Sequence, residues 1–311
     1  MAPRWEKLGQ IYCPSETGRH PKLATHAANP LPVWLEGDVY RIFYSGRDVT
    51  NRSSVGAVDI DIVNRQIVRE HFDPCFEYGP KGSFYADGVS IGCCYAAGGT
   101  RYMLFMGWQT PPDAHFRGDI GRLIVSDDLT LHLENSTPFM ASNDTDPISL
   151  SYPWVEGDER NGYTMWYGTT STWDAGNGEM IHSISHATSE DGQHWHRRGP
   201  SVPYELGRAQ AFSRPTVAHD GSGGLDMWFS CRGPNEKYWI GRATSSDGRQ
   251  WKLALEDVGI APSAEGWDSE MIEYPYVFDH KGHRYMLYCG NGYGRTGFGL
   301  AEWQERPIER T

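Results

Sequence analysis

The chain has 311 residues, of which 39% are hydrophobic and 22% charged, and this composition excludes an intrinsically disordered protein. Its 28 basic and 40 acidic residues give a formal charge of −12, so neither nucleic acid nor an anionic membrane is expected as a partner. The polar N-terminus has no apolar signal segment and no run of 18 apolar residues occurs, so we expect a cytoplasmic protein. The six cysteines form no metal-binding or redox spacing, and neither a cofactor nor a metal site is predicted.

Five short segments recur along the chain, each with a Pro or Gly at its end. They are His26–Pro30, Phe84–Gly88, Ser149–Pro153, Ala211–Pro215 and Met271–Pro275. The residues before the Pro or Gly are 58, 65, 62 and 60 positions apart, which is long enough for four strands and their turns. We therefore expect a repeated four-stranded unit.

A second, aromatic-rich strand follows each of these segments, and a third strand follows the second. The second strands are Tyr40–Arg47, Tyr102–Trp108, Tyr163–Thr169, Leu225–Arg232 and Tyr285–Asn291. The third strands are Val55–Ile60, Ile120–Val125, His182–Thr188, Ile240–Thr244 and Phe298–Glu302. Asp191-Gly192 and Asp247-Gly248 then favour tight turns into an outer strand, because Asp-Gly adopts the positive φ that such turns require.

The last repeat leaves little chain for an outer strand, whereas Trp5–Tyr12 resembles the stretch that follows the turn in other repeats. Pairing of the two chain ends would close a ring and remove exposed sheet edges. The sequence therefore predicts an all-β fold, a five-bladed β-propeller of four-stranded blades closed by the N-terminal strand. A single domain over residues 1–311 is expected. A β-sandwich, the alternative, does not explain the period.

The first strand of each blade would line a central channel, so the recurring segments should meet there. Their anchor residues are Asn29, Asp87, Tyr152, Arg214 and Tyr274, with Glu273 and His26 close by. The ends of the second strands add Arg47, Asp48, Trp108, Arg232 and Asn291. Aromatic rings that stack on a sugar, beside groups that bind its hydroxyls, are typical of a carbohydrate site.

This pattern resembles the five-bladed propeller glycosidases of families 43, 32/68, 117 and 130. The resemblance is strongest in Trp267–Phe278 and Met286–Gly294. Glu273-Tyr274-Pro275 is similar to the Glu-Cys-Pro or Glu-Gly-Pro segment that carries the acid in those families, and Asp87-Gly88 stands where relatives have Asp-Pro. The chain departs at Asn29-Pro30, where families 43 and 32 carry an Asp and family 130 has a similar Asn-Pro. It also departs at Arg214, where family 43 would have a third carboxylate if its blades are shifted by one.

The resemblance implies an inverting glycosidase with Glu273 as general acid and Asp87 as the base that activates water. Burial near Tyr274, Tyr276 and Trp267 would raise the pKa of Glu273. Two blades of separation correspond to roughly 8–9 Å between the carboxyl groups, within the inverting range of about 6.5–9.5 Å. The predicted substrate contacts are His26, Asn29, Arg47, Asp48, Trp108, Tyr152, Arg214, Arg232, Glu270 and Asn291.

Several of these residues have a structural alternative. Asp87 could cap backbone N–H groups in a turn, and Glu273 could form an ion pair with Arg214. Glu270 could be the functional carboxylate or a rim residue, and His26 could bind a cation or simply make a hydrogen bond. Trp108 could pack between blades.

The expected substrate is a short oligosaccharide, a glycoconjugate precursor or a glycosylated metabolite. A phosphorylase remains open beside a hydrolase. A sugar-binding propeller without hydrolysis, or one recruited to a biosynthetic step on a sugar conjugate or natural product, is the alternative function. A protein-interaction scaffold would not need charged groups in the channel.

Overall fold

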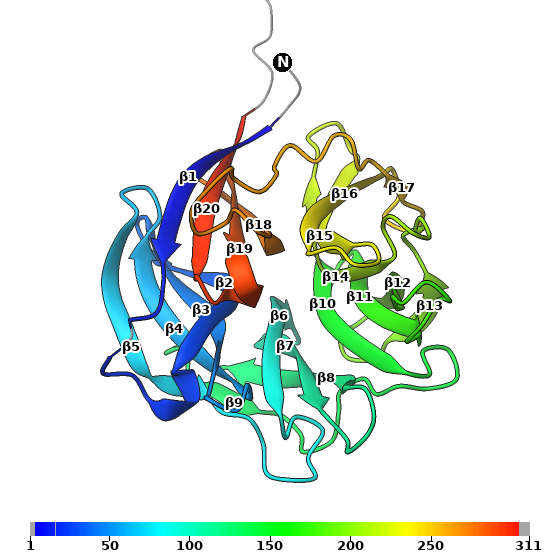
Figure 1. Cartoon of the computed structure of the whole chain (residues 1–311), viewed down its shortest axis with the longest axis horizontal. Helices are drawn as coiled ribbons and strands as arrows, with labels where there is room; N and C mark the ends of the chain where they lie inside the picture. Colours follow the sequence, from blue (N-terminus) through cyan, green and yellow to red (C-terminus); the bar gives the residue numbers. More distant parts are fainter. Residues whose placement is uncertain (1–3, 16, 305–311) are drawn as a thin grey trace, which may run out of the picture.

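The computed structural model describes residues 4–15 and 17–304, which fold into short antiparallel strands arranged around a common centre (Figure 1). Strands that follow one another in sequence pair in groups of four. The first group contains β2 (Thr25–Glu36), β3 (Val39–Arg47), β4 (Ser53–Asp61) and β5 (Gln66–Phe76). The second contains β6 (Gly88–Ala97), β7 (Thr100–Gln109), β8 (Arg117–Val125) and β9 (Leu131–Leu133).

The remaining strands continue this pattern. The third group contains β10 (Ser149–Asp158), β11 (Gly162–Thr172), β12 (Ile181–Ser189) and β13 (His196–Pro200). The fourth contains β14 (Ala211–His219), β15 (Leu225–Arg232), β16 (Trp239–Ser245) and β17 (Lys252–Leu253). The last contains β18 (Glu273–His280), β19 (His283–Cys289) and β20 (Phe298–Gln304) with β1 (Arg4–Tyr12). A one-turn 3₁₀ helix, η1 (Pro21–Leu23), and a short helix, α1 (Asn291–Gly294), lie between strands.

Strand β1 is the outer strand of the last sheet, where it pairs antiparallel with β20 (Figure 1). The predicted pairing of the two chain ends is therefore confirmed. The first strands of the groups contact one another in succession, β2 with β6, β6 with β10, β10 with β14 and β14 with β18, and β18 contacts β2. Residues at the start of these strands consequently face one central region although they lie far apart in sequence.

Each inner strand has a β-bulge near its start, where two residues of the inner strand lie opposite one residue of the partner strand. The shift follows Ala28 in β2, Ser151 in β10, Ser213 in β14 and Glu273 in β18. In all four strands the next residue, a non-glycine, has a positive φ: 55° at Asn29, 28° at Tyr152, 49° at Arg214 and 54° at Tyr274. Non-glycine residues seldom adopt this conformation, and its recurrence beside a central cavity is typical of a functional region.

The second repeat was aligned wrongly from sequence. In β6 the corresponding shift lies between Ile91 and Cys94, after Asp87-Gly88. The segment there is Gly92-Cys93, without Pro, and a side chain on Gly92 would lie 2.6 Å from the carbonyl oxygen of Pro153. With Gly92 as the anchor the spacings between anchors become 63, 60, 62 and 60 residues. Asp87 is then not an anchor on the inner strand but the residue directly before β6.

Arg214 occupies the centre, where it is 1% exposed. Its Nη1 donates to the carbonyl oxygens of Tyr274 and Pro275 at 2.8 and 3.1 Å, and its Nη2 donates to that of Pro30 at 2.8 Å. The guanidinium thus joins β14 to β18 and β2. This position differs from the substrate contact expected from sequence, because the donors are already directed to backbone carbonyls.

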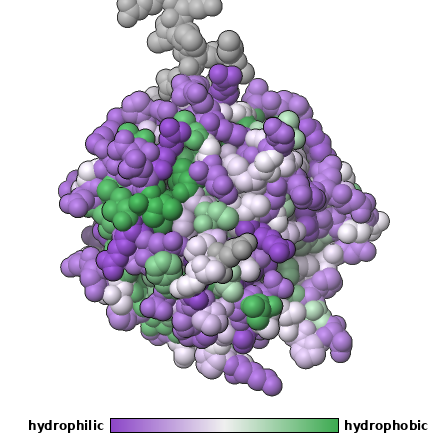
Figure 2. All heavy atoms as spheres, turned by 60° about the vertical axis from the view of Figure 1, so that its left-hand side comes forward, coloured by the Kyte–Doolittle hydropathy of each residue, from purple (hydrophilic) through white to green (hydrophobic). Residues whose placement is uncertain are grey.

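The surface around β5 is largely hydrophilic, with a limited apolar area (Figure 2). Exposed apolar side chains of this first group are Trp34, Val63, Ile67, Val68 and Phe72. Neither of the two helices within the described residues is long and apolar enough to cross a membrane.

Candidate functional site

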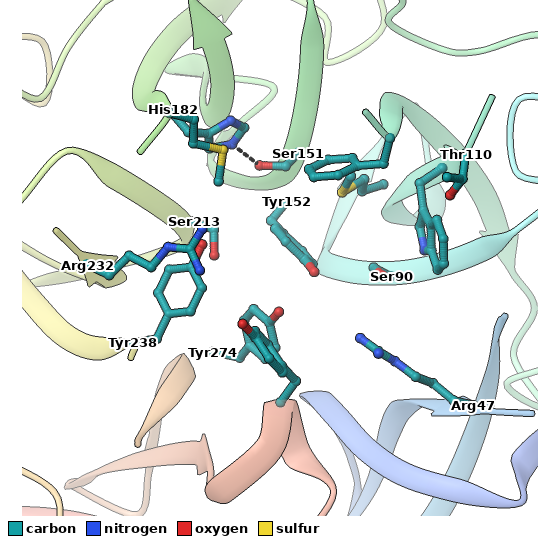
Figure 3. A pocket seen from close by; sticks show the side chains of 15 residues that line it. Arg47, Ser90, Thr110, Ser151, Tyr152, His182, Ser213, Arg232, Tyr238 and Tyr274 are labelled. Carbon is teal, nitrogen blue, oxygen red and sulfur yellow. Dashed lines mark hydrogen bonds between the residues drawn. The ribbon is translucent and has the colours of Figure 1, made fainter. Parts of the chain in front are cut away.

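A cavity of about 470 Å³ lies at the centre of the ring, where side chains from separate sheets point into a common space (Figure 3). Its lining is mainly aromatic, hydroxylic and basic. The lining residues are Arg47, Ser90, Met106, Trp108, Thr110, Phe116, Ser151, Tyr152, Met180, His182, Ser213, Arg232, Tyr238, Tyr274 and Tyr293. Four residues predicted from sequence, Arg47, Trp108, Tyr152 and Arg232, are therefore brought together.

Glu273 begins β18 directly before Tyr274, a lining residue of the cavity, and is completely buried. Neither carboxyl oxygen has a hydrogen-bond partner among the described residues. Burial raises the pKa of Glu273 well above its usual range, and the opposing influence of Arg47 and Arg232 is smaller. The expected alternative, an ion pair with Arg214, is not formed. A glutamate in this state retains its proton to a higher pH than an exposed one, as a general acid requires.

Asp87 directly precedes β6, is half-buried and is not among the residues that line the cavity. Its Oδ2 accepts a hydrogen bond from the backbone N–H of Thr110 at 2.6 Å, and its own N–H donates to the carbonyl of Trp108. Both partners line the cavity. The capping role considered from sequence is thus present, while Oδ1 makes no hydrogen bond within residues 4–15 and 17–304.

The two predicted arginines of the cavity differ in their partners. Arg232, at the end of β15, forms an ion pair with Glu179 at 2.8 Å between Nε and Oε2, and its guanidinium lies 4.7 Å from the centre of the Tyr238 ring. Arg47 ends β3 and points toward the middle of the cavity (Figure 3). Within the described part of the chain its guanidinium has neither an ion pair nor a hydrogen bond.

His26 and Asn29, both on β2, border this region without lining the cavity. His26 Nδ1 is 2.8 Å from Thr25 Oγ1, and burial together with Arg47 and Arg295 lowers the pKa of His26 to about 4. The imidazole is therefore neutral at physiological pH. Asn29 is 1% exposed, and neither atom of its side-chain amide has a hydrogen-bond partner in the described structure.

Besides Arg214, three predicted substrate contacts bind other parts of the protein, namely Asp48, Glu270 and Asn291. Asp48 accepts hydrogen bonds from Thr50 and Arg52 and so shapes the turn after β3. Glu270 is exposed and forms an ion pair with Lys237, which makes it a rim residue.

Asn291 uses both sides of its amide to hold the preceding loop. Its Oδ1 accepts from the backbone N–H groups of Glu270 and Met271, and its Nδ2 donates to Gly266. The amide oxygen is thus engaged with the loop, and Asn291 is not among the residues that line the cavity.

Sequence reasoning missed a Ser–His–Thr chain in the cavity wall. Ser151 Oγ is 2.6 Å from His182 Nε2 (Figure 3). On the other side of the imidazole, Thr170 Oγ1 is 2.7 Å from His182 Nδ1. Burial, with a smaller effect of Arg232, lowers the pKa of His182 to about 4, so it acts as a neutral hydrogen-bonding group. A side chain on Gly168 would lie 2.2 Å from Ser151 Oγ, which explains the glycine at this position.

The cavity combines these polar groups with aromatic surfaces. Tyr152 and Tyr274 contact each other with ring centres 5.4 Å apart, and Trp108 donates from Nε1 to Ser53 Oγ at 3.2 Å. Such a lining can stack on sugar rings and bind hydroxyl groups. No group of three His, Cys, Asp or Glu side chains suited to a metal ion occurs among the described residues.

Comparisons with known proteins agree with this architecture. No protein-family model matches the sequence. Two Mycobacterium tuberculosis proteins, the uncharacterized protein MT1551 of strain CDC 1551 and the uncharacterized protein Rv1502 of strain H37Rv, are each 44% identical over 299 residues. These cover 96% of this chain and 98% of each relative.

Among solved structures, a glycoside hydrolase superposes with a TM-score of 0.74 at 17% identity, covering 100% of this chain and 94% of the other. A second solved structure belongs to work on family 130, which contains mannoside phosphorylases and glycoside hydrolases. It superposes with a TM-score of 0.69 at 12% identity, covering 97% of this chain and 94% of the other. A thermostable family 43 glycoside hydrolase has a TM-score of 0.66 at 13% identity, with 92% and 91% covered. The predicted resemblance to propeller glycoside hydrolases is thereby confirmed at the level of fold.

Proposed function

The chain belongs to the family of the Mycobacterium tuberculosis proteins MT1551 and Rv1502, and we propose that it is a carbohydrate-processing enzyme that cleaves a glycosidic bond. We interpret its groups of four strands as the blades of a five-bladed propeller, with the cavity at the mouth of the axis. The observation that carries the proposal is the buried carboxyl group of Glu273, without a hydrogen-bond partner among the described residues.

Glu273 serves as the general acid. Burial raises its pKa, so the carboxyl group keeps its proton to a higher pH than an exposed glutamate does, and the proton passes to the leaving-group oxygen as the bond from that oxygen to the anomeric carbon breaks. The adjacent Tyr274 and its neighbour Tyr152 provide aromatic surface for a sugar ring.

Asp87 serves as the base in the hydrolytic form of the proposal. Its Oδ1 takes a proton from water while the water oxygen bonds to the anomeric carbon, which inverts the configuration. The hydrogen bond from the Thr110 N–H to Oδ2 holds the carboxylate next to a lining residue of the cavity, and the half-buried side chain is partly open to water.

Phosphorolysis is the second candidate. Asp87 is half-buried and does not line the cavity, and Glu270 pairs with Lys237 on the rim. Glu273 is therefore the one carboxyl group of the three predicted candidates that is fully buried next to a lining residue. An acid combined with inorganic phosphate as nucleophile would need no second carboxylate.

The experiment is a screen of aryl glycosides and oligosaccharides with and without inorganic phosphate. We expect Glu273→Gln to lower turnover of an active substrate at least about 10²-fold, because the amide has no proton to donate. Glu270→Gln, a matched change on the rim, should leave the rate within about twofold.

Asp87→Asn separates the two reactions. A loss of at least about 10²-fold supports hydrolysis with Asp87 as base, whereas phosphate-dependent turnover that survives this change supports phosphorolysis. Wild-type turnover in Glu273→Gln contradicts the acid assignment. Binding without turnover across the screen favours the sugar-binding alternative.

A further inference from the structure

Arg47 differs from the other arginines at the centre of the molecule. Arg214 donates to backbone carbonyls, and Arg232 is neutralised by Glu179. Arg47 lines the same cavity, yet its guanidinium has no protein partner in the described part of the chain. A guanidinium offers five fixed donors that match a carboxylate or phosphate in a bidentate arrangement, so it is a preformed anion-binding group.

The charges around Arg47 do not neutralise it. The carboxylate next to it in sequence, Asp48, is paired with Arg52. Glu273 is completely buried and forms no ion pair with Arg47, and its burial disfavours the charged form. Arg295 adds a second positive charge, and both Arg47 and Arg295 act on His26.

The local positive charge contrasts with the whole chain, whose formal charge is −12. A neutral hydroxyl accepts a charge-assisted hydrogen bond from a guanidinium, whereas a carboxylate or phosphate also gains the attraction between opposite charges and the matched bidentate geometry. The negative charge of the whole protein repels an anionic ligand, so such a ligand can bind only where a positively charged side chain is close by. Arg47 supplies such a side chain in the cavity.

We propose that the sugar bound in the cavity carries an anionic group, a carboxylate or a phosphate ester, which forms a bidentate contact with Arg47. The inference rests on the proposed function in that it assigns the substrate class of the same cavity. Trp108 and Tyr152 line the cavity with Arg47, so an acidic sugar can place its ring on an aromatic face and its charge on the guanidinium.

The test is equilibrium binding by titration calorimetry at constant ionic strength, with glucuronate, glucose 6-phosphate and glucose as probes. Binding does not require turnover, so the measurement is also made on Glu273→Gln. We expect one charged probe to bind wild type and Glu273→Gln more tightly than glucose does. Arg47→Gln should weaken that binding about 10- to 100-fold, a larger loss than it causes in the affinity for glucose.

Arg160→Gln, in the exposed turn between β10 and β11, is the matched control and should bind like wild type. Arg47→Lys keeps the charge but loses the bidentate geometry, so we expect it to bind the charged probe with intermediate affinity. If Arg47→Gln fails to fold, Arg47→Lys provides the test in its place. Preference for glucuronate identifies a carboxylate ligand, and preference for glucose 6-phosphate identifies a phosphate ester. Equal behaviour of the charged probes and glucose, including no binding at all, overturns the proposal. An unaltered affinity of Arg47→Gln for the charged probe does so too. Charge-selective binding without turnover would support the anion site and contradict the enzyme.

Discussion

Replacement of Glu273 by Gln should stabilise the protein, and the gain should increase with pH. The carboxyl group is fully buried and makes no hydrogen bond to the described residues, so folding raises its pKa well above the ordinary glutamate value. At a pH below the unfolded-state pKa of about 4.3 the group is protonated in both states and costs no ionisation energy. Above that pH the unfolded chain loses the proton and the folded chain keeps it.

The magnitude follows from this difference in bound protons. Between the unfolded and folded pKa values the folded state binds one more proton, so the free energy of unfolding falls by about 1.4 kcal/mol per pH unit. A glutamine does not titrate and lacks this loss. From pH 5 to pH 7 the stability of Glu273→Gln relative to wild type should therefore rise by about 2–3 kcal/mol, provided the folded pKa exceeds 7. The pH at which the difference levels off measures the folded pKa.

Urea denaturation of wild type and Glu273→Gln at a series of pH values from 5 to 8 provides the measurement. Glu190→Gln is the control, because Glu190 is exposed after β12, and its curve should run parallel to that of wild type. Parallel curves for Glu273→Gln as well would refute the reasoning, since they would mean that Glu273 ionises equally in both states.

Three further substitutions test the framework of the site. Arg214→Met leaves buried carbonyl groups without a donor and should cost about 3–5 kcal/mol in urea denaturation; a loss below about 1 kcal/mol would contradict its central role. Gly88→Ala places a methyl group 2.2 Å from Trp108 Nε1, so it should displace the indole and shift the tryptophan fluorescence, and an unchanged spectrum would show that the wall yields elsewhere. Lys237→Ala removes an exposed ion pair with Glu270 and should change the free energy of unfolding by less than about 0.5 kcal/mol in the same urea assay, whereas a larger change would show that the rim matters for stability.

The sequence carried enough information for the strand pattern and for part of the cavity. Two strands rich in aromatic residues end shortly after a small residue, and this pattern predicted the positions of Arg47 and Trp108. Arg47 ends β3, Trp108 lies one residue before the end of β7, and both line the cavity as expected. The stretch Trp5–Tyr12 could be assigned to the last sheet because that repeat otherwise lacked an outer strand. These inferences depend on local patterns, which the fold preserves.

Alignment of the second repeat failed because the signal used was chemical rather than geometric. Asp87-Gly88 looks like the Asn-Pro, Tyr-Pro and Arg-Pro anchors, but the β6 irregularity falls at Gly92-Cys93, where neither residue resembles an anchor. The more even spacing would have revealed this. When the repeats are aligned by the register shift of each inner strand, Ser151, Ser213 and Glu273 occupy the same position. Ser151 and Ser213 line the cavity.

The roles of charged residues at the centre could not be read from sequence, because they depend on which backbone groups lie opposite. Arg214 is a repeat anchor and Glu273 directly precedes the anchor Tyr274, so an ion pair between them was a reasonable alternative. Arg214 instead meets the carbonyl groups of Tyr274, Pro275 and Pro30, which an irregular inner strand leaves without partners of their own. Guanidinium satisfies several carbonyls at once, whereas a carboxylate would repel them.

Arg214 donates to backbone carbonyls and Arg47 forms no ion pair with Glu273, so the burial of its carboxyl group outweighs the charges near it and produces its unusual state. A buried carboxyl group without partners costs stability, and folded proteins retain such groups where function requires them. The same absence of partners that destabilises the fold raises the pKa of Glu273 and preserves its proton. Stability and turnover should therefore change in opposite directions when this one side chain is replaced. A variant that gained stability and kept its activity would separate the two and remove the reason for assigning Glu273 to the chemistry.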